Sequence, residues 1–211
     1  MPPRAYNNEM RQLQQADLKA RIAEAAAQLH ATQGVLATSY AQVAQQAGVS
    51  LPTVYKHFPT LDELVQACSG HVAAQAPTFP QQRLQEAPDL PAAVDVLVEA
   101  CDRQHAHFEP WISWREHQRI PALAALAERN REQLQGLCHS LLERHGVTGD
   151  LTALAGVWES LLAFDFWQRL VRAHRLGRTA ARARQRHLLL AAAGPAPAAD
   201  PSPRPTRKTR T

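Results

Sequence analysis

The segment from Ser50 to Phe58 gathers side chains that can donate and accept hydrogen bonds at close spacing. Ser50 can cap the first turn of a helix, and Pro52 lies in that turn, where no N–H is needed. Val54 and Phe58 are apolar at helical spacing, so we expect both to face inward. The polar groups left on or near the outer face belong to Thr53, Tyr55, Lys56 and His57. A short helix with such a face suits a DNA major groove.

The residues before this segment predict the elements that would position it. A helix is expected to begin after Thr38, whose hydroxyl can cap free N–H groups. Its small apolar face is formed by Val43, Ala44 and Ala47. Gly48 supplies the left-handed residue that ends this helix. Residues 34–64 therefore predict a helix-turn-helix followed directly by another helix.

This stretch resembles the N-terminal DNA-binding domain of the Tet-repressor (TetR/AcrR) family of transcriptional regulators. The residues that fit the family pattern are Thr38, Val43, Ala44, Ala47, Gly48, Val49, Ser50, Thr53, Tyr55, His57, Phe58 and Leu64. The preceding helix, from Arg21 through Leu29, is similar to the family's first helix. The sequence departs at Leu61, where a lysine is usual, and at Val35, where an aromatic is common.

The motif and the resemblance together indicate DNA-binding residues. We expect contacts from Thr38, Ser39, Ser50, Leu51, Pro52, Thr53, Tyr55, Lys56 and His57. Lys56 can donate to guanine or to a phosphate, and Leu51 and Pro52 can touch a thymine methyl. The resemblance implies that Tyr55 and His57 hold phosphates.

Composition favours an all-α protein of ordinary globular type. The chain has 211 residues, 45% of them hydrophobic, with a formal net charge of +4. Its three cysteines have no zinc-ligand or redox-motif spacing, so free thiols are expected. No signal segment or long apolar run is present, which predicts a soluble cytoplasmic protein without a membrane partner.

Four regions are expected along the chain. Residues 1–15 read as a flexible polar arm, 16–60 as the helix-turn-helix domain, 61–193 as a helical effector-binding and dimerisation domain, and 194–211 as a disordered basic Pro-rich tail. In the third region, the expected helices are about 60–75, 91–108, a short one opened by Pro110, 121–145, 151–170 and 178–192.

Aromatic and aliphatic residues of the second half supply two further sets of candidates. Candidates for lining an effector pocket are His105, Phe108, Trp111, Trp114 and Trp158. Candidates for a dimer interface are Leu154, Trp158, Leu161, Phe166, Leu188 and Leu190, which a four-helix bundle from two subunits would bury. Core packing is the alternative for these aromatics.

Other side-chain groups leave alternatives open. His139 and Glu143 have a spacing that zinc could use, but no third ligand is evident and a solvated face is favoured. Arginines from Arg169 to Arg186 form either a solvated face or a site for an anionic ligand. No catalytic motif, metal site or cofactor is indicated.

The sequence therefore predicts a homodimeric transcriptional regulator, in function a ligand-responsive repressor of a palindromic operator, with an unidentified small-molecule effector. The alternatives are a dimeric small-molecule binding module without specific operator binding, suggested by Leu61, and a helical enzyme using its histidines.

Overall fold

The computed structural model describes residues 4–194, and these residues are helical with no strand, as predicted. The predicted tail lies outside the described residues, apart from Gly194. The elements are α1 (Arg4–Gln33), α2 (Tyr40–Ala47), α3 (Leu51–His57), α4 (Leu61–Ala74), α5 (Gln81–Gln85), α6 (Leu90–Ile112), the 3-10 turn η1 (Glu116–Gln118), α7 (Pro121–Arg144), α8 (Leu151–Leu162), α9 (Phe164–Gln168), the π-helical turn η2 (Arg169–Ala173) and α10 (Arg178–Ala193).

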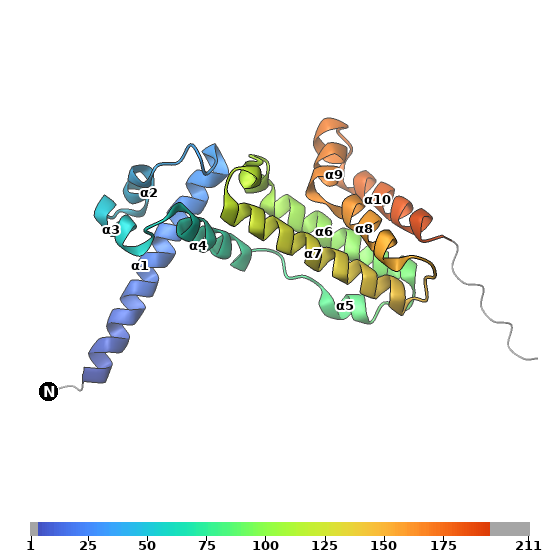
Figure 1. The fold of residues 1–211 in the computed structure, drawn as a ribbon, viewed down its shortest axis with the longest axis horizontal. Helices are drawn as coiled ribbons and strands as arrows, with labels where there is room; N and C mark the ends of the chain where they lie inside the picture. Colours follow the sequence, from blue (N-terminus) through green and yellow to red (C-terminus); the bar gives the residue numbers. More distant parts are fainter. Residues whose placement is uncertain (1–3, 195–211) are drawn as a thin grey trace, which may run out of the picture.

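Helix α1 begins at Arg4, whereas we predicted a polar arm over residues 1–15. Most residues of this stretch are good helix formers, and neither Gly nor Pro interrupts the chain between Arg4 and Gln33. Residues 9–17 are exposed, so local propensity rather than packing extends the helix. In Figure 1 this N-terminal part of α1 stands clear of the other helices.

Helices α1 to α4 pack around one small core. The helix-turn-helix pair contributes Val43, Ala44, Ala47, Val54 and Phe58, which are buried against α1. Helix α4, which the sequence placed in the next region, adds Leu64, Cys68 and Val72 to the same core. The DNA-binding candidates are therefore held by four helices (Figure 1).

The second core lies between α6, α7, α8 and α10 (Figure 1). Helix α6 differs from our prediction, because Pro110 lies inside it and opens no new helix. Proline removes one helical hydrogen bond. Trp111 Nε1 donates to Ala27 O at 2.8 Å, a contact that holds this last turn of α6 against α1.

The predicted single helix over 151–170 is interrupted at Ala163, where ψ is 151°. The carbonyl of Leu162 would accept an N–H from the next turn in a continuous helix. Instead, His105 Nε2 lies 2.7 Å from Leu162 O and donates to it. Helix α8 therefore ends at Leu162, and the chain turns into α9.

A line of acidic residues on α6 fixes the C-terminal segment. Asp95, Asp102 and Glu109 recur every seven residues, so they share one side of the helix. They pair with arginines of η2 and α10: Arg186 with Asp95, Arg178 and Arg182 with Asp102, and Arg172 with Glu109. Four of the clustered arginines thus already bind carboxylates, which argues against an anion site built from them.

Asp102 is the buried member of this line. It is 2% exposed, receives Arg178 Nη2 at 2.7 Å, and accepts Trp167 Nε1 at 2.8 Å. Removing one partner of a buried charge is more costly than the pair itself is stabilising.

We therefore expect Arg178→Met to lower the free energy of unfolding by about 3 kcal/mol, the lower end of the range for breaking a buried pair, since Arg178 itself is half exposed. Urea unfolding followed by circular dichroism measures this loss. Arg184→Met, at an exposed position of the same helix, is the matched control and should change stability by less than about 0.5 kcal/mol. Equal stability of the two variants would contradict the role of Asp102.

Candidate functional site

The face of α3 that points away from the core is polar and accessible. Ser50 caps the helix by accepting Thr53 N at 3.3 Å, and Val54 is fully buried. On the other side, Tyr55 is 49% exposed, and Leu51, Pro52 and Lys56 are exposed as well. The structure therefore brings the predicted contact residues onto one short outward face.

Three predicted contact residues are less free than the sequence suggested. Ser50 Oγ and Thr53 Oγ1 lie 2.7 Å apart and hydrogen bond to each other, although Ser50 itself stays exposed. Thr53 and His57 are half-buried. Tyr55 and Lys56 are thus the more accessible hydrogen-bonding groups of α3.

The cap of α2 is Ser39, and our assignment of this role to Thr38 is wrong. Ser39 Oγ accepts Gln42 N, while Gln42 Oε1 accepts Ser39 N at 2.8 Å. Thr38 Oγ1 instead donates to Gly34 O at 2.7 Å. The pattern Ser39-x-x-Gln42 is a capping box, which the sequence contained. Gly48 ends α2 with φ of 66°, as predicted.

Tyr40 is a neighbour of the site that sequence reasoning missed. Its ring centroid lies 4.6 Å from that of Tyr55, with the planes tilted by 51°. Burial raises the pKa of the Tyr40 phenol, with smaller contributions from Tyr55 and Glu63. Tyr40 therefore supports the Tyr55 ring from α2 and stays protonated near neutral pH.

A carboxylate of η1 contacts the turn between α1 and α2. Glu116 Oε2 accepts Val35 N at 2.6 Å, and Oε1 accepts Leu36 N at 2.8 Å. Gly34 precedes them with φ of 82°, and a Cβ there would lie 2.9 Å from Glu116 Oε1. These contacts join residues some 80 positions apart, so no local signal in the sequence marked Glu116.

Two tryptophans that were predicted to line a pocket contact α1. Trp111 also lines a large cavity, and Trp114 does not. Trp111 Nε1 donates to Ala27 O, and Trp114 Nε1 lies 3.4 Å from Ala31 O. His107 Nε2 donates to Val72 O of α4 at 3.0 Å. The end of α6 and the turn after it therefore connect the two cores.

A cavity of about 1780 Å³ lies between α4, α6, α7 and the α8–α9 junction. Three of the predicted pocket residues line it, namely His105, Phe108 and Trp111. Trp114 does not line it, and our placement of Trp158 there is wrong. Trp158 is 0% exposed and donates to Leu189 O at 3.0 Å, so it belongs to the core. Residues of α4 and α7 complete the wall; among them are Val72, Leu126, Leu134 and Leu137.

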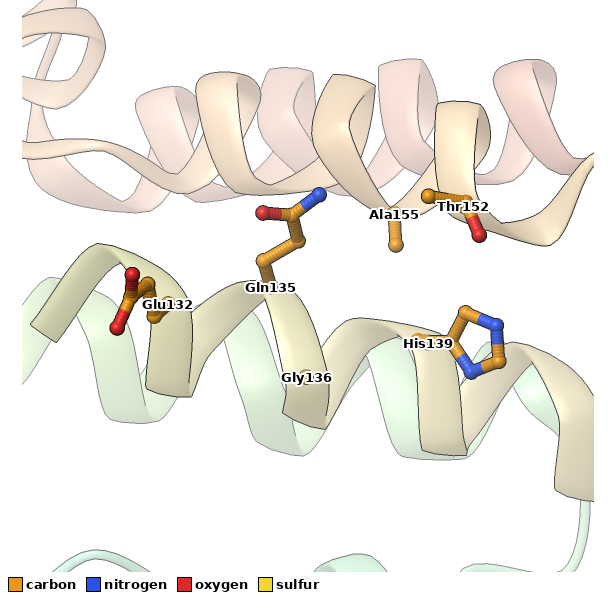
Figure 2. A pocket seen from close by; sticks show the side chains of 6 residues that line it. All are labelled: Glu132, Gln135, Gly136, His139, Thr152 and Ala155. Carbon is orange, nitrogen blue, oxygen red and sulfur yellow. The ribbon is translucent and has the colours of Figure 1, made fainter. Parts of the chain in front are cut away.

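A second, smaller hollow of about 250 Å³ lies on the surface between α7 and α8. Figure 2 shows Gln135 reaching from α7 toward α8, with Glu132 and His139 on either side of it. Glu143 does not line this hollow. Among the described residues, no group of three or more His, Cys, Asp or Glu side chains could hold a metal ion. The zinc alternative for His139 and Glu143 therefore has no third ligand in this part of the chain.

Helices α8 and α10 present an apolar strip to solvent. Val157 is 47% exposed and Leu188 is 39% exposed. The predicted interface residues Leu154 and Leu161 of α8 and Leu190 of α10 are half-buried, as is Phe166 of α9. Trp158 cannot contribute to a surface because it is fully buried, and the sequence reading missed Val157, which lies one residue before it.

None of the described helices is long and apolar enough to cross a lipid bilayer.

Comparison with known proteins agrees with this geometry. The sequence pattern described as "Bacterial regulatory proteins, tetR family" matches residues 22–68, which include the C-terminal part of α1, all of α2 and α3, and the first half of α4. No curated protein sequence matches the chain.

Solved structures with the same fold include regulators from several bacteria. A transcriptional regulator from Rhodococcus sp. Rha1 is 22% identical with a TM-score of 0.59, covering 82% of this chain and 96% of its own. NalD, the secondary repressor of the MexAB-OprM multidrug efflux pump in Pseudomonas aeruginosa, is 20% identical with a TM-score of 0.59 and covers 83% and 95%. A protein from Saccharomonospora viridis, solved in complex with choline, is 20% identical with a TM-score of 0.64 and covers 82% and 96%.

Residues 22–68 thus match the tetR family of bacterial regulatory proteins, and the described residues share the all-α fold of solved transcriptional regulators.

Proposed function

We propose that this chain is a DNA-binding transcription regulator of the tetR family, a ligand-responsive repressor that binds a palindromic operator as a homodimer. The observation that carries the proposal is the exposed face of α3, where Tyr55 and Lys56 point outward from a capped helix whose Val54 is buried. Two such helices in one dimer would enter successive major grooves. Selection of bound sequences from random DNA with the purified protein tests the proposal and yields the operator.

The contacts to DNA follow from the placement of the side chains. Lys56 donates to a guanine edge or a phosphate, and Tyr55 donates to a phosphate from its position on Tyr40. Leu51 and Pro52 lie exposed at the start of α3, where they can contact a thymine methyl. Ser39, at the start of α2, stays exposed and can add a phosphate contact.

The apolar strip on α8 and α10 supports the homodimer. A second copy of the strip, related by two-fold symmetry, would cover Val157, Leu161 and Leu188 in a four-helix bundle. Residues exposed in one subunit would then be buried, as the hydrophobic effect favours.

The large cavity supports the effector response. It extends from Glu116 and His30, next to the DNA-binding helices, to α7 and the end of α8. A ligand that fits one arrangement of these helices better than another would shift the dimer between states with different spacing of the two α3 helices. The choline complex of the Saccharomonospora viridis protein shows that a relative with this fold takes a small molecule.

One observation favours a second candidate function. Leu61 is exposed at the start of α4, where the family usually has a lysine that can sit near phosphate. If the protein is a dimeric small-molecule binding module without specific operator binding, it does not need this lysine. A salt titration of binding to labelled genomic DNA separates the two, since specific binding survives salt that removes the non-specific kind.

The first prediction from the proposed function concerns the outward face of α3. Tyr55→Ala and Lys56→Ala should each weaken operator binding by about 1–3 kcal/mol, the scale of one good contact. Fluorescence anisotropy with the selected operator measures this loss. Arg184→Ala, at an exposed position of α10, is the control and should bind as the wild type does. Wild-type affinity in both α3 variants, with unchanged circular dichroism, would refute the assignment.

The second prediction concerns the strip on α8. Val157→Glu should yield monomers, because it would place two like charges at the seam of the proposed dimer. Operator binding should fall with it, since the two half-sites lie about 34 Å apart and one subunit reaches only one. Thr152→Glu, on the other side of α8 beside the small hollow, should remain dimeric. Light scattering reports both masses, and a monomeric wild type would contradict the dimer.

The third prediction concerns the contact between the two cores. Glu116→Gln should weaken the hold on the α1–α2 turn, because an amide offers one acceptor oxygen in place of two. The loss of a charged hydrogen bond corresponds to about 1.5–3 kcal/mol. Hydrogen exchange at the amides of Val35 and Leu36 should accelerate. Glu132→Gln, an exposed carboxylate of α7, should leave these amides unchanged, and equal exchange in both variants would rule out the contact.

A further inference from the structure

Three polar side chains of the large cavity are already bonded to the protein. Gln104 Nε2 donates to Pro77 O, and His105 Nε2 donates to Leu162 O at 2.7 Å. Trp111 Nε1 donates to Ala27 O at 2.8 Å. A ligand that needed a hydrogen bond from one of these groups would first have to break a bond within the protein, which cancels most of the gain.

Two ionisable groups at the inner end of the cavity, His30 and Glu116, offer no free charge. His30 is buried, and its Nδ1 lies 3.4 Å from Cys68 Sγ. Burial lowers the pKa of His30 to about 4, against an opposing effect of Glu116, so the ring is neutral near pH 7. The Glu116 carboxylate is occupied by the N–H groups of Val35 and Leu36.

Charged residues elsewhere on the wall lie toward solvent. Arg129, Arg131 and Arg144 of α7 are exposed, and Arg131 pairs with Glu128. Asp165 is exposed and pairs with Arg115. These charges therefore belong to the rim, where water screens them.

Glu159 is the remaining carboxylate of the wall, on α8. Burial raises its pKa, and the positive charge of Arg131 opposes that rise. The guanidinium of Arg131 already compensates part of the Glu159 charge and would repel a cationic ligand that approached this carboxylate.

The rest of the wall is apolar and extended. It includes Val72, Phe79, Phe108, Leu126, Leu134 and Leu137, contributed by α4, the segment after it, α6 and α7. The volume of about 1780 Å³ exceeds the usual range for a small-molecule pocket, about 300–1,000 Å³. The cavity can therefore hold a long molecule, and the surface that it offers is mainly hydrophobic.

We propose that this cavity takes an uncharged, elongated, mainly apolar molecule, which is held by contact area and not by a charge pair. The inference rests on the proposed function, in which the cavity is the effector site. A charged head group would have to give up its water without gaining a full counter-charge from the wall, which is strongly unfavourable. An uncharged chain has no comparable hydration free energy to lose, and burial of its apolar surface favours binding.

Three probes with the same ten-carbon chain test the proposal. 1-Decanol, decanoate and decyltrimethylammonium are titrated, below their micellar concentrations, into the purified full-length protein in a calorimeter at pH 7. We expect decanol to bind at least about tenfold more tightly than either ion, a difference of about 1.4 kcal/mol. Equal or tighter binding of decanoate or of the ammonium probe, or no binding of decanol, would overturn the inference.

A matched pair of variants locates the bound probe. Ala127→Trp adds bulk at the cavity wall, and Ala125→Trp adds the same bulk at an exposed position of α7 that does not line the cavity. Decanol affinity should fall about tenfold in the first variant and stay at the wild-type value in the second. Unchanged affinity in Ala127→Trp, with its fold intact by circular dichroism, would place decanol elsewhere and overturn the proposed site.

Operator binding without any probe is measured on the same preparation, which separates this inference from the proposed function. Tight operator binding without a preference for decanol overturns the ligand class alone. A clear preference for decanol in a protein that selects no DNA sequence supports the ligand class and contradicts the operator.

Discussion

The buried carboxylate of Asp102 is the interaction on which the C-terminal half depends. A charge that is 2% exposed is tolerated only when it is paired and hydrogen bonded, and Asp102 obtains both from Arg178 and Trp167. These partners come from α10 and α9, so the pairing fixes the position of both along α6. The acidic residues one heptad to either side extend the same register. With α10 held in this way, α8 packs between α10 and α7, and the apolar strip shared by α8 and α10 is left facing outward.

Helix α6 also connects the C-terminal helices to the DNA-binding helices. Its last turns contact α4 through His107 and α1 through Trp111, and the turn that follows brings Glu116 to the backbone of the α1–α2 connection. The same helix lines the large cavity from Cys101 to Ile112. Helix α6 thus contacts the cavity, α10 and the helix-turn-helix domain. A displacement of α6 would therefore change the shape of the cavity and the positions of the other two.

Much of the fold follows from local signals in the sequence. The ends of α2, α3, α4 and α7 are marked by caps, glycine or proline, and the inward positions of Val54 and Phe58 follow from helical spacing. The errors have tertiary causes. Pro110 stays inside α6 because contacts beyond it hold the helix, and the break at Ala163 coincides with a hydrogen bond from His105, 57 residues away. For the candidate site, the outward residues of α3 could be predicted, but Tyr40, Val157 and Glu116 could not, because their surroundings come from other helices.

The contacts between the two cores have a consequence for how the chain reaches its fold. Glu116 to Val35 spans 81 residues, Trp114 to Ala31 spans 83 and Trp111 to Ala27 spans 84. The entropy of closing a loop depends mainly on its length, so the first of these contacts to form carries nearly the whole cost and the others follow at little extra cost. Contacts within α1 to α4 are more local and are expected to form earlier, as low contact order favours fast folding. We therefore expect the two cores to dock late and in one concerted step. The helix-turn-helix would fold first, and the end of α6 would pack against it afterwards.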